Sequence, residues 1–261
     1  MTDSNLIVRH EPPLGWVMVN RPTARNAMTT AMWQQLSDEV QALVDDDEIR
    51  VIILAGAGDR SFISGADIGD LKAQLTKPEL VTESYRFTTV LMDTISNAPK
   101  PVIAMVNGHC FGGGVLIALA CDLRFASQSA QFCIPAVKLG VAYPPEHGVA
   151  RLVYTVGATH ATDILLSGRI LDSQEAFRVG IVNRVLEPNE LIEETRTYAL
   201  RLAEGAPLSH AAHKLAIQQT IRAVRDYTAI ENAVMRCYRS EDCHEGLAAF
   251  LEKRPPNFVG K

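Results

Sequence analysis

NGHCFGGGVLIALACD, residues 107–122, places three consecutive glycines ahead of a short apolar run. Gly112, Gly113 and Gly114 would each cost a helix about 1 kcal/mol relative to alanine. Some feature of the protein must therefore require backbone without side chains at this point. The candidates are a bound phosphate, a sharp turn, close packing of a helix on a strand, and a ligand atom that approaches the backbone.

Buried strands are predicted on both sides of the glycines. PVIAMVNG (101–108) precedes them, DLRFAS (122–127) follows, and VIILAG (51–56) lies upstream. Their apolar runs are typical of strands buried on both faces of a parallel sheet. Amphipathic helices are predicted over residues 30–46 and 79–97, and two early strands flank a Pro-Pro-Leu-Gly turn at residues 12–15. The alternation predicts an α/β fold.

The last third of the chain has a different pattern. Asp172 with Glu175 resembles a capping box at the start of a short helix. Further helices are predicted over residues 189–205, 207–221, 228–238 and 240–254, the last ending before Pro255 and Pro256. We therefore expect an α/β core over residues 1–200 and a helical part over residues 201–261.

Composition excludes several classes of protein. A formal net charge of −5 and the lack of any Lys/Arg run argue against nucleic acid as a partner. Five cysteines without a CxxC pair predict reduced thiols in a cytoplasm-like compartment. No secretory signal or membrane span is expected, because no basic segment leads into an apolar one and no apolar stretch reaches about 18 residues.

Common ligand motifs do not account for the glycines. GAGDRS (56–61) lacks the third glycine of a dinucleotide fingerprint, and no Gly-Lys-Ser/Thr follows the triglycine run. Neither GxSxG nor HExxH occurs. His109, Cys110 and Cys121 lack the spacing of metal ligands, so no metal site is expected. A purely structural role in tight strand–helix packing remains open.

A second loop suggests a catalytic role. SFISGADIGDL (61–71) follows VIILAG, just as the glycines follow PVIAMV. If these two strands are neighbours in a parallel sheet, both loops lie at its carboxyl edge, where α/β proteins bind ligands. One N–H group from each loop would then point at a single oxygen, the second from a helix N-terminus that favours negative charge. Such a pair is an oxyanion hole.

Five motifs resemble the crotonase (enoyl-CoA hydratase/isomerase) superfamily in the family's order: NRPTARNAM, FISGADI, PVIAMVNGHCFGGG, ALACDLRFAS and AFLEKRPPNF. The resemblance implies a spiral of ββα units followed by helices that assemble homotrimers or dimers of trimers. It implies that the N–H groups of Ala66 and Gly113 hold the oxygen of an acyl-CoA thioester. CoA belongs to the substrate, so no separate cofactor is implied.

The same resemblance places CoA along the chain. Asp67 and Ile68 would lie beside the adenine and Arg25 near the phosphates or pantetheine, while Gly69 replaces a lysine of many members. Phe258 and Lys261, with Lys253, would reach CoA from a neighbouring C-terminus. The full set of expected substrate contacts is Arg25, Ser64, Gly65, Ala66, Asp67, Ile68, Gly112, Gly113, Leu116, Ala136, Phe258 and Lys261.

Two positions depart from the family's hydratase pattern. Hydratases of the family use a glutamate two residues after the triglycine and another after a proline, and these positions are Leu116 and Ala136 here. Hydrocarbon side chains exchange no proton. Enoyl-CoA hydration by the two-glutamate mechanism is therefore not expected.

The segment LGVAYPPEHGVARL (139–152) offers other acid–base groups. Tyr143 matches a tyrosine of methylmalonyl-CoA decarboxylases of the superfamily, and Glu146 falls near an acidic residue of some isomerases and dehalogenases. Decarboxylation, double-bond isomerisation and thioester cleavage are expected in that order. Two alternatives stay open: a solvated loop without a catalytic role, and an acyl-CoA-binding paralogue without turnover.

Overall fold

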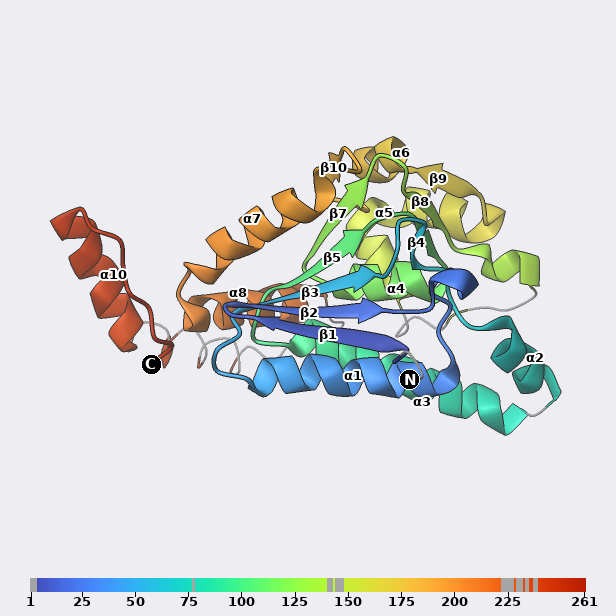
Figure 1. Cartoon of the computed structure of the whole chain (residues 1–261), viewed down its shortest axis with the longest axis horizontal. Coiled ribbons are helices and arrows are strands. Elements are labelled where there is room, and N and C mark those ends of the chain that lie inside the picture. The colour runs from blue at the N-terminus through green and yellow to red at the C-terminus, as the bar shows by residue number, and fades with distance from the viewer. Residues whose placement is uncertain are drawn as a thin grey trace.

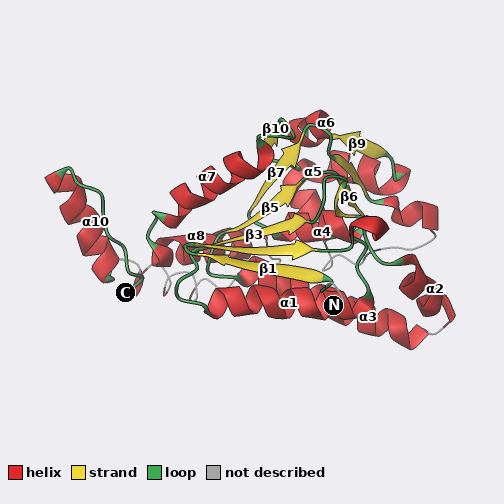
Figure 2. Ribbon diagram, in the orientation of Figure 1, coloured by secondary structure: helices red, strands yellow, loops and turns green. Residues whose placement is uncertain are grey.

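The computed structural model of the chain describes residues 4–76, 78–139, 143, 148–221, 228, 232, 235–236 and 239–261. Its strands form two sheets, one of six strands in the order β1-β2-β3-β5-β7-β10 and one of four in the order β4-β6-β8-β9 (Figures 1 and 2). The strands are β1 Leu6–Glu11, β2 Leu14–Val19, β3 Val51–Gly56, β4 Ser61–Ile63, β5 Val102–Val106, β6 His109–Phe111, β7 Leu123–Ser127, β8 Gln131–Cys133, β9 Ile170–Asp172 and β10 Arg184–Leu186. The α-helices are α1 Thr30–Asp45, α2 Ile68–Thr76, α3 Pro78–Asn97, α4 Gly113–Ala120, α5 Val149–Ser167, α6 Ser173–Arg178, α7 Leu191–Ala203, α8 Pro207–Ile221 and α10 Glu241–Glu252, with 3₁₀ turns η1 Pro22–Ala24 and η2 Pro135–Leu139.

The larger sheet is buried on both faces. Alternate residues of its strands enter two different cores, Ile52 and Leu54 on one side and Val51 and Ile53 on the other. Helix α7 covers the second face and contacts β2, β3, β5 and β7. This confirms the α/β prediction and explains why β3 and β5 read as continuous apolar runs.

The hairpin that opens the chain is tighter than its sequence predicts. Glu11 pairs with Leu14, and His10 pairs with Gly15. Leu14 and Gly15 therefore belong to β2, and the turn consists of Pro12 and Pro13 alone. The predicted four-residue turn is wrong because an apolar pair after two prolines was assigned to the loop.

The chain passes repeatedly from the larger sheet to the smaller one. Strand β3 is followed by β4, β5 by β6, and β7 by β8, and a helix or turn follows each pair. Gly56 and Gly108 lie at the first two of these crossings, where a Cβ would overlap the carbonyl oxygens of Ser61 and Arg60. Repeated ββα units are the arrangement that the family resemblance implied.

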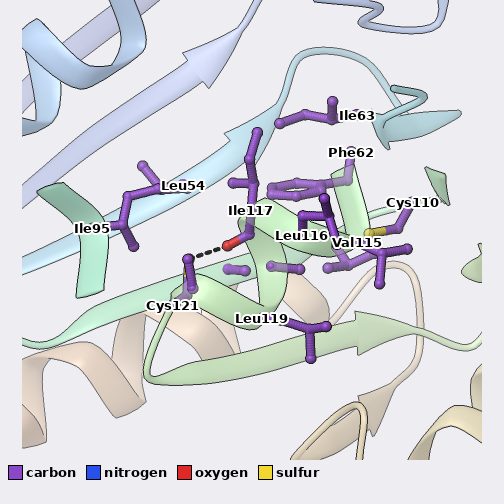
Figure 3. Packing of buried hydrophobic residues seen from close by; sticks show 14 of the residues in the cluster. Leu54, Phe62, Ile63, Ile95, Cys110, Val115, Leu116, Ile117, Leu119 and Cys121 are labelled. Atoms are coloured by element: carbon purple, nitrogen blue, oxygen red, sulfur yellow. Dashed lines mark hydrogen bonds between the residues drawn. The ribbon is translucent and has the colours of Figure 1, made fainter. Parts of the chain in front are cut away.

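Helix α4 runs through the middle of the molecule. All eight of its residues are buried, and Leu54, Phe62 and Ile95 lie around it (Figure 3). At Gly114 a Cβ would overlap the carbonyl oxygen of Ile63. The packing explanation is therefore correct for this glycine.

A buried arginine binds the other end of α4. The guanidinium of Arg124 donates to the carbonyl oxygens of Ala118 at 3.3 Å and Cys121 at 2.8 Å, and also to that of Ile181 at 2.6 Å. The last carbonyls of a helix have no partner within it. Arg124 supplies that partner where water has no access.

Helix α7 packs on the larger sheet, and α8 contacts α3 and α5. In α8, Lys214 forms a 2.6 Å ion pair with Asp122 and donates to the carbonyl oxygen of Lys100. The C-terminal tail folds back along α10, where the Asp242 carboxylate accepts from the N–H groups of Val259 and Gly260. The helix predicted over residues 228–238 lies largely outside the described residues, and the boundary at residue 200 stays a prediction.

One half of the predicted capping box is present at α6. Asp172 accepts a 2.7 Å hydrogen bond from the N–H of Glu175 and caps the helix. The Glu175 carboxylate binds Arg169 in place of the Asp172 N–H. None of the helices in the described part of the chain is long and apolar enough to cross a membrane.

Asn26 ties the NRPTARNAM segment to the start of β4. Its side chain is fully buried, accepts from the N–H of Arg21 at 2.9 Å, and donates to the carbonyl oxygens of Ala57 at 3.1 Å and Ser61 at 2.7 Å. Its φ of 57° is a conformation that asparagine and aspartate tolerate better than other residues.

Replacing Asn26 therefore tests this anchor. Asn26→Asp keeps the tolerated conformation and the acceptor for Arg21 but sets a carboxylate oxygen against two carbonyl oxygens. We expect the free energy of unfolding to fall by at least about 2 kcal/mol, the cost of leaving buried polar groups unsatisfied. Urea denaturation measures it. Asn26→Asp unfolding at the same urea concentration as the parent would show that these hydrogen bonds contribute nothing.

Candidate functional site

The two glycine-containing loops lie side by side. Strands β4 and β6 pair in parallel, so the segments after Ile63 and Phe111 leave the same edge of the smaller sheet. A Cβ on Gly65 would lie 3.2 Å from the carbonyl oxygen of Phe111 and 3.7 Å from the amide nitrogen of Gly113. Gly65 and Gly112, with φ of 103° and 51°, take backbone conformations that favour glycine.

The predicted position of these loops needs one correction. The strands β3 and β5 are parallel neighbours, as predicted, but neither loop follows them directly. Each loop follows a three-residue strand of the smaller sheet. Strands this short leave too few residues for an alternating pattern, so the sequence did not reveal them.

The N–H groups of Ala66 and Gly113 have no hydrogen-bond partner among the described residues. Gly113 is buried and is the first residue of α4, where the helix carries partial positive charge. Ala66 is exposed. Met28 brackets it, donating to the carbonyl oxygen of Gly65 and accepting from the N–H of Asp67, both at 2.8 Å. Two free donors on adjacent loops are the arrangement that can bind one partly negative oxygen.

Asp67 is held by the protein itself. Its carboxylate accepts from Arg21 at 2.9 Å and from the N–H of Gly69 at 2.9 Å. The hydrogen bond from Arg21, helped by that from Gly69, lowers the pKa of Asp67. An ion pair thus fixes the loop after Ala66, and the sequence prediction of an adenine contact at Asp67 did not include it.

The other expected CoA contacts at this edge are accessible. Ile68 is 71% exposed at the start of α2. Arg25 is exposed in the turn that follows η1, and Ser64 is half-buried beside Gly65. Ile68 therefore presents an exposed apolar side chain two residues after Ala66.

Apolar side chains occupy the two positions where the hydratase pattern has glutamates. Leu116 is 2% exposed on α4, and Ala136 is 6% exposed in η2. A Cβ on Gly148, which precedes α5, would lie 2.5 Å from Cδ2 of Leu116. No carboxylate stands at either position, so neither can transfer a proton.

Tyr143 places its hydroxyl near Gly112, which precedes α4. Its oxygen would lie 3.6 Å from a Cβ on Gly112. Burial raises the pKa of Tyr143 above its ordinary value, and Tyr85 raises it further. The phenol is therefore a proton donor at neutral pH. Glu146 and His147 lie outside the described residues.

The structure does not bring the chain's own C-terminus to this site. The carbonyl oxygen of Phe258 accepts from Arg50 at 3.0 Å, just before β3 begins, and that of Lys261 accepts from the N–H of Asp242. Figure 1 shows α10 and the C-terminus at the opposite end of the molecule from α2. The predicted contacts of Phe258 and Lys261 therefore depend on a neighbouring subunit.

Sequence analysis missed two side chains that support the site. Arg21 lies within the quoted NRPTARNAM motif but was given no role, and it binds Asp67. Trp33 falls within the amphipathic helix predicted over residues 30–46 and was given no role at the site, yet its ring lies against Gly113. Within the described part of the chain, no group of three or more His, Cys, Asp or Glu side chains is placed to hold a metal ion.

Comparison with known proteins agrees with this geometry. The model of the family described as enoyl-CoA hydratase/isomerase matches residues 12–261. The chain is 36% identical over 100% of both chains to the crotonyl-CoA hydratase of Syntrophomonas wolfei. It is 34% identical to the carnitinyl-CoA dehydratase of Salmonella arizonae, again over 100% of both chains. The chain belongs to the enoyl-CoA hydratase/isomerase family.

Solved structures of the enoyl-CoA hydratase/isomerase family share the whole architecture. An enoyl-CoA hydratase/carnithine racemase from Magnetospirillum magneticum aligns with a TM-score of 0.93 at 34% identity, covering 100% of this chain and 97% of that one. The enoyl-CoA hydratase of Geobacillus kaustophilus aligns with a TM-score of 0.87 at 37% identity, covering 99% of each chain. The crotonase-type fold predicted from the five motifs is confirmed.

Proposed function

We propose that this protein binds an acyl-CoA thioester and stabilises the enolate of its acyl group, in a reaction other than two-glutamate hydration. One observation carries the proposal: two N–H groups on adjacent loops have no partner among the described residues, and the chain has the apolar Leu116 and Ala136 where the family resemblance implies the hydratase glutamates. Relatives named crotonyl-CoA hydratase and carnitinyl-CoA dehydratase support a CoA thioester as the substrate.

The oxyanion hole consists of the N–H groups of Ala66 and Gly113. The thioester oxygen accepts a hydrogen bond from each. When a bond at the α-carbon breaks, its electron pair moves into the carbonyl group and negative charge builds on that oxygen. The partial positive charge at the N-terminus of α4 then stabilises this charge more than it stabilises the neutral substrate, which lowers the barrier.

Decarboxylation is the reaction that needs the fewest side chains. Loss of CO₂ leaves its electron pair on the α-carbon, so the enolate forms without a base. The enolate then takes a proton, and Tyr143 has a hydroxyl beside Gly112 that can supply it. Double-bond isomerisation is the second candidate. It requires a base that removes a carbon-bound proton and returns it, and Glu146 is the residue that we assign to that role.

A paralogue that binds acyl-CoA without turnover is the alternative. Such a protein would have the same two backbone donors but no working acid or base. Binding of CoA therefore does not separate an enzyme from a binding protein, whereas product formation does.

We further propose a homotrimer or a dimer of trimers in the cytoplasm, in which Lys253, Phe258 and Lys261 of a neighbouring subunit reach CoA.

Ala66→Pro tests the oxyanion hole. It removes an N–H that pairs with no described residue, and the bonds of Met28 to both sides of Ala66 remain. We expect turnover to fall by about 10²–10³-fold, the cost of one lost oxyanion donor. Ala66→Ser, which keeps the N–H, is the matched control. Full turnover in Ala66→Pro would refute the hole.

A panel of thioesters tests the reaction. Malonyl-type, enoyl and aryl CoA thioesters are incubated with the protein, and products are identified by mass spectrometry. We expect decarboxylated or isomerised product, and hydration of crotonyl-CoA slower by at least about two to four orders of magnitude than in a two-glutamate hydratase, since the loss of even one acid–base group costs about 10²–10⁴-fold. Rapid hydration would show that Leu116 and Ala136 do not occupy the acid–base positions.

Two substitutions separate decarboxylation from isomerisation. Glu146→Gln should abolish isomerisation and spare a decarboxylation in which Tyr143 is the acid, whereas Tyr143→Phe should slow the decarboxylation. Because burial raises the pKa of Tyr143, the rate should not fall with rising pH until above about pH 10, the ordinary phenol value. The pH–rate profiles of the parent protein and of Glu146→Gln measure this, and Tyr143→Phe should lack the fall at high pH. If both variants keep the full rate, the segment around residue 143 has no catalytic role.

A further inference from the structure

One short segment at the start of α1 contacts both loops of the site. Met28 pairs with the backbone on either side of Ala66. Five residues later, Trp33 reaches Gly113. The segment is itself tied to the first loop, because the N–H of Thr30 donates to the Asp70 carboxylate at 2.5 Å. Residues 28–33 therefore connect the two donors through the protein.

The indole of Trp33 lies against Gly113. A Cβ on Gly113 would lie 2.5 Å from Cη2 of Trp33, closer than real Cβ contacts, and 3.1 Å from Cζ2. The ring is only 4% exposed, so it has little room to move away. Its far edge occupies the space that any side chain at residue 113 would need.

Residues next to Gly113 use their N–H groups in backbone hydrogen bonds, whereas the N–H of Gly113 has no partner among the described residues. The N–H of Gly112 donates to the carbonyl oxygen of Cys133 at 2.8 Å, and that of Val115 donates to the carbonyl oxygen of Gly112 at 3.1 Å. Gly113 has neither a side chain nor a described partner for its N–H. The three atoms nearest to the position of a Cβ on Gly113 all belong to the Trp33 ring.

We propose that Trp33 is a positioning residue, which fixes the Gly113 N–H at the distance from Ala66 that an enolate oxygen requires. The inference rests on the proposed oxyanion hole. Trp33 touches no reacting atom and acts through Gly113. A structural residue would affect only stability, whereas a positioning residue affects how well the enolate is stabilised.

Trp33→Phe is the most conservative test. A phenyl ring on the same Cβ is shorter, so it keeps an aromatic core residue and withdraws the edge that contacts Gly113. The chain has one other tryptophan, Trp16, which is 6% exposed in the separate core under α7. Trp16→Phe removes the same atoms away from the site and is the matched control.

Acetoacetyl-CoA provides a readout that does not depend on knowing the substrate. It is a β-ketothioester whose enolate absorbs in the near ultraviolet, so the enolate fraction of the bound ligand reports on the hole directly. With Trp33→Phe we expect the enolisation constant of bound acetoacetyl-CoA to fall by about 10- to 100-fold, the scale of an error of about 1 Å in a catalytic group. Its dissociation constant should change by less than about threefold, because CoA itself contacts other residues.

Complementation gives the sharper test. Gly113→Ala alone places a methyl group on the indole and should lower enolisation. In Trp33→Phe/Gly113→Ala the methyl group takes the space that the indole edge has left, so enolisation should recover above that of either single variant. Non-additivity of this kind marks a direct contact.

The outcomes separate the two proposals. Loss of enolisation in both Ala66→Pro and Trp33→Phe, with Trp16→Phe unchanged, supports the positioning role. If Ala66→Pro loses enolisation and Trp33→Phe keeps it, the hole stands and the role of Trp33 is wrong. If Trp16→Phe loses as much as Trp33→Phe, the effect is one of stability alone and the role is again wrong. If Ala66→Pro binds and enolises acetoacetyl-CoA normally, the proposed function fails.

Discussion

The arrangement of the molecule depends on how closely the backbone of α4 approaches the backbone of β4. Gly114 lies so close to the carbonyl oxygen of Ile63 that no Cβ fits between them. Because the first turn of α4 lies directly on the end of β4, the segments that follow β4 and β6 become neighbours. A larger residue at position 114 would separate Ala66 from Gly113, and with them the two free donors.

The buried position of α4 also determines the polar environment of its two ends. A helix buried on every side has no water to satisfy its ends, and the two ends of α4 have different hydrogen-bond partners. At the C-terminal end, the buried guanidinium of Arg124 binds the carbonyl oxygens of Ala118 and Cys121. At the N-terminal end, the N–H of Gly113 has no partner among the described residues. The positive end of the helix is the end to which we assign the thioester oxygen.

The fold was largely readable from the sequence, because continuous apolar runs such as VIILAG are the mark of strands buried on both faces. The smaller sheet was not readable, since three-residue strands such as β4 and β6 have no period. At the site, the glycines and the motifs around Ala66 and Gly113 were informative because their residue types are costly elsewhere. Contacts between distant segments, such as Arg21 with Asp67 and Trp33 with Gly113, leave no pattern along the chain, and only the folded structure reveals them.

The two donors of the proposed hole are peptide groups, and this has a consequence for descent. Point substitutions other than those to proline exchange side chains and leave peptide N–H groups in place. The acid–base side chains of such a scaffold can therefore change while the loops around Gly65 and Gly112 keep their backbone donors. Overall similarity then follows the scaffold and does not by itself identify the reaction.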